Sequence, residues 1–111
     1  MTKETLDLIR SKYERQFNTN ETMAVLRQNL GIFWSWGATG FTNCEDKGLL
    51  FKSNGRHHKG YVLITLAWDD TYSVYIITTH GNVLNEYKMV YFEDLVEVID
   101  NRIERIAAYV R

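Results

Sequence analysis

The chain has 111 residues, a length that fits one domain and leaves no room for two ordinary ones. Hydrophobic residues make up 45% of it and the formal net charge is -1, so the composition excludes a disordered chain. The same balance argues against a protein whose main task is to neutralise a nucleic-acid backbone. The single cysteine, Cys44, excludes an internal disulfide framework.

The first residues bear on the location of the protein. Residues 1–17 are charged throughout and contain no apolar run, so we expect no secretory signal there. The longest mostly apolar stretch, residues 60–81, is interrupted by polar residues and a turn, so we also expect no membrane span. These patterns predict a cytoplasmic protein without a membrane partner.

Two helices are predicted near the start of the chain. Over residues 4–17, apolar side chains recur at helical spacing and charged side chains occupy the other faces. The polar run 18–20 interrupts this pattern. A second helix is predicted over 21–30, with Asn20 as its N-cap and Gly31 as its C-terminal stop.

Strand patterns fill the middle of the chain. Residues 60–81 form its centre, where two alternating strands flank a tight turn at Asp69 and Asp70. Both parities of these strands are apolar, so alternation alone does not tell which face is buried. The predicted strands are 32–36 with a continuation at 41–44, then 49–52, 62–68, 72–79 and 83–90.

The last segment, residues 92–110, predicts a long amphipathic helix. Its apolar stripe consists of Phe92, Leu95, Val96, Ile99, Ile103, Ile106 and Val110. We therefore expect an α+β domain: an antiparallel meander of four to five strands, the C-terminal helix on one face, and two N-terminal helices. One domain spans 1–111, with 1–19 as an N-terminal helical appendage to a core of 20–110.

Several short sequences carry a resemblance to known proteins. Leu30-Gly31 ends a predicted helix, and the run GATGF at 37–41 and the run GLLF at 48–51 follow in order. The run YVLITLAWDDTY then places Asp-Thr-Tyr at the turn. Over about residues 22–105 the chain resembles short uncharacterised proteins encoded by bacterial phages and integrated mobile elements. The basic loop at 56–59 and the extra N-terminal helix depart from that pattern. The resemblance implies a mobile-element context and no known activity.

Metal binding would have to use His57, His58, His80 and Cys44. Adjacent residues on an extended chain point in opposite directions, so His57 and His58 do not readily share one site. No spacing typical of zinc ligands occurs in the sequence. We therefore predict no metal and no cofactor.

Catalysis would have to use the carboxylates of Asp69 and Asp70, or Cys44 with a histidine. A strand of about nine residues separates Asp70 from His80, which corresponds to roughly 30 Å. That distance is too large for an acid–base pair. Nothing near Cys44 in the sequence indicates thiolate activation. We predict no catalytic residues and a non-enzymatic protein.

Aromatic residues favour protein binding. The chain has seven tyrosines and three tryptophans, the residue types that anchor protein interfaces. The candidates for an exposed sheet face are Trp68, Tyr72, Tyr75, Tyr87 and Tyr91. The predicted function is protein–protein contact, with an unidentified protein partner or in a homodimer. The alternative is that these rings fill the second face of the sheet under the N-terminal helices.

A second functional prediction is weak binding of single-stranded nucleic acid. The middle of the chain is locally basic through Lys52, Arg56, His57, His58 and Lys59. Trp34, Trp36, Phe41 and Phe51 would supply rings for base stacking. The slightly negative total charge makes this partner less favoured than a protein.

Overall fold

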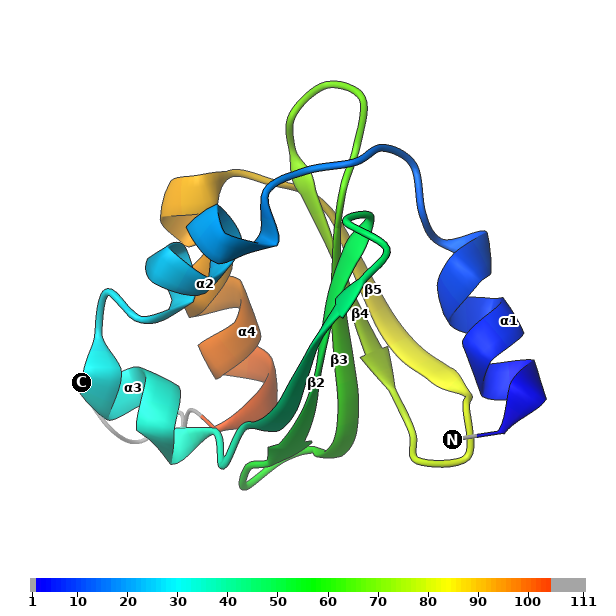
Figure 1. The fold of residues 1–111 in the computed structure, drawn as a ribbon. Helices are drawn as coiled ribbons and strands as arrows, with labels where there is room; N and C mark the ends of the chain where they lie inside the picture. The colour runs from blue at the N-terminus through cyan, green and yellow to red at the C-terminus, as the bar shows by residue number, and fades with distance from the viewer. Residues whose placement is uncertain (1, 105–111) are drawn as a thin grey trace.

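The computed structural model describes residues 2–104, which form one antiparallel sheet with helices on both of its faces (Figure 1). The elements, in chain order, are α1 (Lys3–Ser11), α2 (Thr19–Leu26), α3 (Leu30–Ser35), β1 (Thr39–Cys44), β2 (Gly48–Asn54), β3 (Lys59–Leu66), β4 (Tyr72–Ile77), β5 (Val83–Val90), the 3-10 turn η1 (Phe92–Asp94) and α4 (Leu95–Ile103).

The five strands lie in their sequence order, β1 to β5, and each pairs with the next in antiparallel fashion. Short turns join them, which is the connection that antiparallel neighbours require. In the central pair, Val62 lies opposite Ile76 and Leu63 opposite Tyr75. The predicted fold class, an α+β meander with helices at both ends of the chain, is confirmed.

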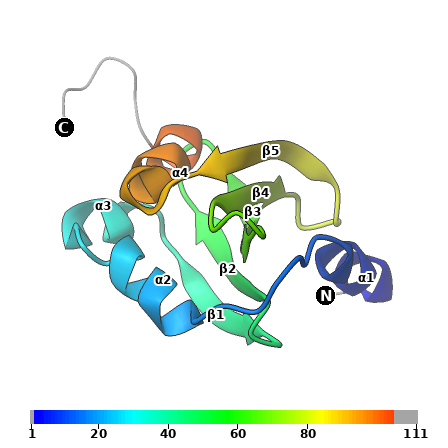
Figure 2. The same ribbon diagram turned by 90° about the horizontal axis from the view of Figure 1, so that it is seen from above.

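The two parities of the central strands are buried against different helices. On the first face, Phe51, Val62 and Ile76 belong to a large core that includes side chains from α2, α3 and α4. On the second face, Leu63 and Tyr75 pack with Ile9 of α1 in a smaller cluster. Figures 1 and 2 show α1 on one side of the sheet and the other helices opposite. This two-sided cover explains why both parities of the hairpin are apolar.

Helix α1, expected as an appendage, crosses the second face from one turn to another. At its start Thr5 contacts Gly81, in the turn between β4 and β5. Near its end Arg10 forms an ion pair of 3.8 Å with Glu45, in the turn between β1 and β2. The corner of this face where β2 ends, at Asn54, lies away from that path.

The strand predicted over 32–36 is wrong, because this segment belongs to helix α3. Asn29 caps the helix by accepting a hydrogen bond of 3.2 Å from the amide of Ile32. Phe33 and Trp36 are three residues apart and are both buried, so they lie on one helical face. Residues 2–38 therefore form three helices before the sheet.

Other helix boundaries also differ from the predictions. Helix α1 ends at Ser11, and α2 begins at Thr19 with Asn18, rather than Asn20, as its N-cap. The C-terminal helix begins as the 3-10 turn η1 and continues as α4. The predicted continuation of that helix to residue 110, with Ile106 and Val110, lies outside the described residues.

Four aromatic rings join α3 to the sheet within the first-face core. Phe51 lies 4.8 Å from Phe41 and 6.1 Å from Trp36, measured between ring centroids. Phe33 completes the group at 5.8 Å from Trp36. The indole Nε1 of Trp36 donates a hydrogen bond of 3.1 Å to Oδ1 of Asp100, which connects α3 to α4.

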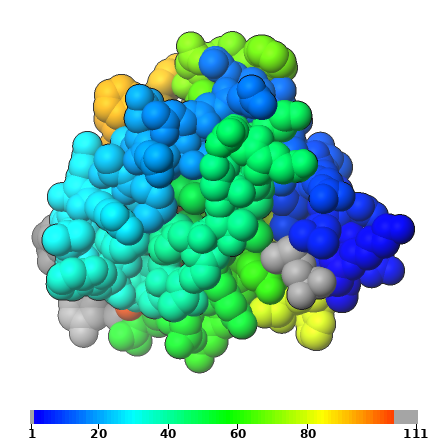
Figure 3. Space-filling model, viewed as in Figure 1, coloured from blue at the N-terminus to red at the C-terminus, as the bar shows by residue number. Residues whose placement is uncertain are grey.

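Both edge strands are irregular. In β1 the pairing register shifts between Thr39 and Thr42, and Gly40 between them has a φ of 64°. In β5 the register shifts opposite the start of β4, and Met89 has a φ of 56°. Figure 3 shows the β1 edge in front, between α2 and α3 on one side and α1 on the other. These irregularities interrupt the straight ladder at both edges of the sheet.

Gly60→Ala is expected to lower the free energy of unfolding by about 1–3 kcal/mol. Gly60 is buried in β3, and a Cβ there would lie 2.6 Å from the carbonyl oxygen of Ile77. Gly31→Ala, in α3, is the matched control: its Cβ would meet only Asn29 Oδ1 at 3.6 Å, so this variant should gain about 0.5–1 kcal/mol of helix stability. Urea denaturation measures both values, and equal stability of the two variants would contradict the steric argument.

Candidate functional site

The structure separates the predicted partner-binding residues. Trp68 is 75% exposed, and Tyr87 is half-buried. Tyr72 and Tyr75 are buried, so their prediction as exposed binding residues is wrong. The hydroxyl of Tyr72 shares a hydrogen bond of 2.9 Å with Thr22 in the first-face core, and Tyr75 lies under α1 on the second face. The two rings are buried because helices cover both faces.

Four of the large exposed apolar side chains come from segments at one end of the sheet. The ladder Leu66–Tyr72–Val90 crosses three strands at this end. Trp68 follows β3 in the β3–β4 turn, and β5 leads directly into η1; both regions lie at the top of Figure 1. We call the set Trp68, Met89, Tyr91 and Phe92 the apolar end; these residues are 75%, 65%, 54% and 62% exposed. The prediction that Phe92 belongs to the apolar stripe of the last helix is wrong, because its ring is exposed in η1.

Hydrogen bonds fix the turn that carries Trp68. The amide of Asp70 donates to the carbonyl of Ala67 at 3.0 Å, and the amide of Ala67 donates to the carbonyl of Thr71 at 2.8 Å. The hydroxyl and the amide of Thr71 both donate to Oδ1 of Asp69, at 2.6 and 3.1 Å, and these bonds hold the pKa of Asp69 below its usual range. The carboxylate of Asp69 therefore stabilises the conformation of the turn.

The connection between α1 and α2 supports the same turn. Asp70 adopts a φ of 65° and forms an ion pair with Arg15, which comes from that connection. A hollow of about 540 Å³ beside Trp68 is lined by Glu14, Arg15, Gln16, Lys47 and Trp68. The exposed indole thus stands on a turn held by its own hydrogen bonds and by a second segment, with charges of both signs around it.

The predicted basic stretch does not form one surface. His58 is buried, its Nε2 lies 3.1 Å from the carbonyl oxygen of Tyr61, and burial lowers its pKa by disfavouring the imidazolium. His58 is therefore wrong as an exposed binding residue. Arg56 and His57 are exposed, but their amides donate to Glu104 and Ile103, at the end of α4. The backbone of these two residues is thus attached to the end of α4.

The other two members, Lys52 and Lys59, line one pocket of about 480 Å³. We call it the lysine pocket; Gly37, Thr39, Lys52, Ser53, Asn54, Lys59 and Thr79 line it. Its residues come from β1, β2 and β3, from Gly37 just before β1, and from Thr79 in the β4–β5 turn. Their convergence depends on strand register, which the sequence does not display.

The aromatic residues proposed for base stacking belong mostly to the core. Trp36 and Phe51 are fully buried, and Phe41 packs against them from β1. Trp34 is 70% exposed on α3. The predicted stacking surface for single-stranded nucleic acid is wrong for Trp36 and Phe51, because both rings are fully buried in the first-face core.

The candidate catalytic and metal-binding residues do not converge. Within residues 2–104, no group of three or more His, Cys, Asp or Glu side chains is placed to hold a metal ion. Burial raises the pKa of the Cys44 thiol, and burial together with Cys44 raises that of Tyr13. A raised pKa keeps the thiol protonated at neutral pH, which is the opposite of an activated nucleophile.

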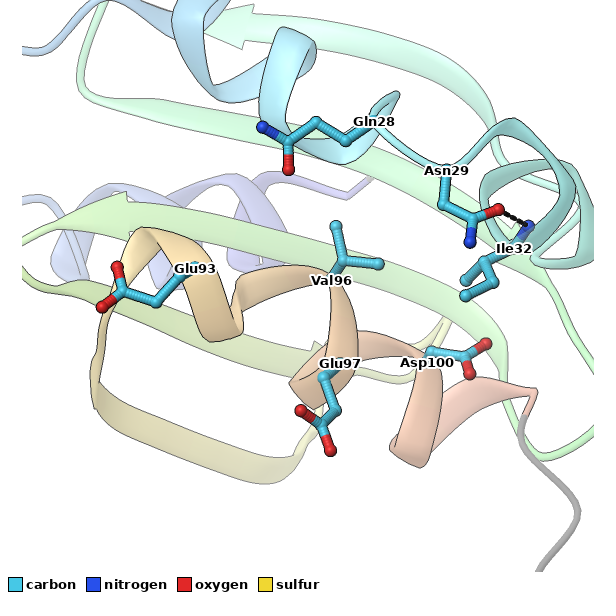
Figure 4. Close-up of a pocket in the computed structure, with 7 residues that line it drawn as sticks. All are labelled: Gln28, Asn29, Ile32, Glu93, Val96, Glu97 and Asp100. Carbon is cyan, nitrogen blue, oxygen red and sulfur yellow. Dashed lines mark hydrogen bonds between the residues drawn. The ribbon is translucent and has the colours of Figure 1, made fainter. Parts of the chain in front are cut away.

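A pocket of about 410 Å³ lies between α4 and the α2–α3 segment (Figure 4). Its lining residues are Gln28, Asn29, Ile32, Glu93, Val96, Glu97 and Asp100. Asn29 is engaged in capping α3 and Asp100 in binding Trp36, while Glu97 points away from Asn29 in Figure 4. Asn29 and Asp100 thus serve the packing of the helices.

No family model, curated protein or solved structure matches this chain. The resemblance to phage and mobile-element proteins therefore stays a prediction from the sequence. Among residues 2–104, no helix has the length and apolar character needed to cross a membrane.

Proposed function

We propose that the protein acts through protein–protein contacts and that the apolar end is its binding surface. The observation that carries the proposal is four large apolar side chains, each more than half exposed, at one end of the sheet. Scattered single apolar residues are normal on a protein surface, whereas a group of them marks an interaction site. Tryptophan and tyrosine, which supply two of the four, dominate binding energies at interfaces.

The rigidity of the β3–β4 turn supports this function. Binding costs less entropy when the contacting side chain is already held in place. The hydrogen bonds of Asp69 and Thr71 and the ion pair of Asp70 hold the backbone beneath Trp68 before any partner arrives. Trp68 therefore has the character of a preorganised anchor.

The edges of the sheet favour contact through side chains over strand pairing. An edge strand recruits another strand through its free backbone groups, and a bulge hinders that pairing. Both β1 and β5 contain such irregularities. A partner would then bind to the apolar end rather than extend the sheet.

A second copy of the chain is the first partner to test. The chain carries 13 basic and 14 acidic residues, so overall charge repulsion between two copies is small.

From the sequence alone, we also propose a cytoplasmic location and a phage or mobile-element context. Weak single-strand nucleic-acid binding is not proposed, because its expected stacking rings Trp36 and Phe51 are buried.

Trp68→Ser is expected to weaken self-association by about tenfold or more, the usual effect of removing an interface anchor. Sedimentation equilibrium over a wide concentration range measures the dissociation constant. Trp34→Ser is the matched control, since it removes an indole of similar exposure, 70% against 75%, from another part of the surface. Phe92→Ser should act in the same direction as Trp68→Ser.

Two results together would contradict the proposal. The first is that the protein stays monomeric at every concentration, and the second is that a photo-crosslinking amino acid at position 68 captures no protein in cells that express the chain. Capture of one defined protein by position 68, but not by position 34, would instead identify a partner other than a second copy.

A further inference from the structure

The lysine pocket occupies the corner of the second face that α1 does not cross. α1 runs from the β4–β5 turn to the β1–β2 turn, where it meets Gly81 and Glu45. The pocket lies where β2 ends and β3 begins, between Asn54 and Lys59. β3 starts at Lys59 and reaches the apolar end only after Leu66, so the two surfaces lie at opposite ends of the sheet and are independent.

Strand register places the two lysines side by side. Lys52 lies opposite Tyr61, and Lys59 lies opposite Asn54, so the lysines are diagonal neighbours on one face. Diagonal neighbours have Cβ atoms about 7–8 Å apart or slightly less, within reach of long side chains. The two flexible side chains can therefore place their ammonium groups on either side of one anion, whose negative charge offsets the repulsion between them.

Neither lysine has a neutralising partner within residues 2–104. The ion pairs of the described chain involve Arg10, Arg15 and Lys88. Of the described residues that line the pocket, none is acidic. Among residues 2–104, no ion pair and no acidic lining residue therefore offsets the positive charge of this corner.

The remaining lining residues suit an anion. Thr39 and Thr79 carry hydroxyl donors, and Asn54 carries an amide donor. Ser53 is engaged elsewhere, since its hydroxyl lies 3.2 Å from the carbonyl oxygens of Trp36 and His58. The volume of about 480 Å³ lies within the range of small-molecule sites, roughly 300–1,000 Å³.

We propose that the lysine pocket binds the phosphate group of a small molecule, with Lys52 and Lys59 on either side of a doubly charged phosphate. Lysine binds phosphate as a compact point charge, and two lysines match the two negative charges of a phosphomonoester. A single-stranded nucleic acid is the less fitting occupant, because none of the described lining residues carries an aromatic ring for base stacking.

The test is a titration of the isotope-labelled full chain with inorganic phosphate and with pyrophosphate, followed by NMR. Amide signals of Thr39, Lys52, Lys59 and Thr79 are expected to shift, and phosphate is expected to raise the melting temperature. Lys52→Gln and Lys59→Gln should each weaken binding by about tenfold, the usual effect of losing a charge-assisted hydrogen bond. Lys52→Arg should bind nearly as well as the wild-type chain.

Two controls keep the proposal falsifiable. Lys47→Gln removes a half-buried charge from the β1–β2 turn, outside the pocket, and should leave phosphate binding unchanged. Chloride at matched ionic strength should not reproduce the shifts. Equal binding by the Lys47 and Lys52 variants, shifts reproduced by chloride, or a response to a single-stranded oligonucleotide with none to phosphate would each overturn the proposal.

Discussion

Phe51→Ala is expected to lower the free energy of unfolding by about 3–5 kcal/mol, the usual cost of deleting a buried aromatic ring. Phe51 is fully buried in β2 and packs between Phe41 and Trp36. Its removal leaves a cavity against rings that are held by their own elements, so the core cannot close around it. A domain of this size has a total stability of about 5–15 kcal/mol, so the substitution should remove a large fraction of it.

Phe92→Ala is the matched control for this prediction. It makes the same chemical change at a ring that is 62% exposed, so the free energy of unfolding should change by less than about 0.5 kcal/mol. Urea denaturation followed by circular dichroism measures both variants. Losses of similar size would show that Phe51 is not at the centre of the core.

Asp100→Ala is expected to lower the free energy of unfolding by about 3 kcal/mol. Asp100 is 4% exposed on α4, and its carboxylate accepts the hydrogen bond from the indole of Trp36, which is itself fully buried. The substitution leaves that N–H without its acceptor in an apolar surrounding, and such a group bears a desolvation cost that no new contact offsets. The substitution also removes the side-chain hydrogen bond that joins α3 to α4.

Asp100→Asn separates the hydrogen bond from the charge. Asparagine keeps a side-chain oxygen in nearly the same position, so this variant should lose less than half as much stability as the alanine variant. In NMR spectra the indole N–H signal of Trp36 should move strongly in Asp100→Ala and little in Asp100→Asn. If alanine and asparagine are equally destabilising, the hydrogen bond to Trp36 is not the reason for burying this carboxylate.

The sheet could be predicted from the sequence because its strands alternate clearly. Residues 62–68, 72–79 and 83–90 were expected as strands, and β3, β4 and β5 occupy those regions. Residues 32–36 were misassigned, because Trp34 and Trp36 alternate in a segment too short to distinguish period 2 from period 3.6. The signal that would have corrected this was Asn29, an N-cap residue three positions before Ile32.

The surfaces were harder to predict than the fold. Tyr72 and Tyr75 have opposite parity, so a sheet with one open face would have exposed one of them. Both are buried, since α1 covers the face that sequence reasoning left open. Trp68 is exposed, but it lies in the β3–β4 turn and not on a face of the sheet, so its exposure comes from the turn geometry. The proximity of Lys52 and Lys59 required the β2–β3 register, which no local pattern reveals.

Helix α1 packs on the sheet through few buried side chains, and this has a consequence for aggregation. Of its nine residues only Thr5 and Ile9 are buried, so this helix should detach at a lower free energy than the rest of the fold. Each detachment would uncover Leu50, Leu63 and Ile77, an apolar strip on three adjacent strands. Amides of α1 should then exchange with deuterium well before those of β3 and β4. A chain truncated to begin at residue 12 should aggregate at temperatures well below its unfolding temperature.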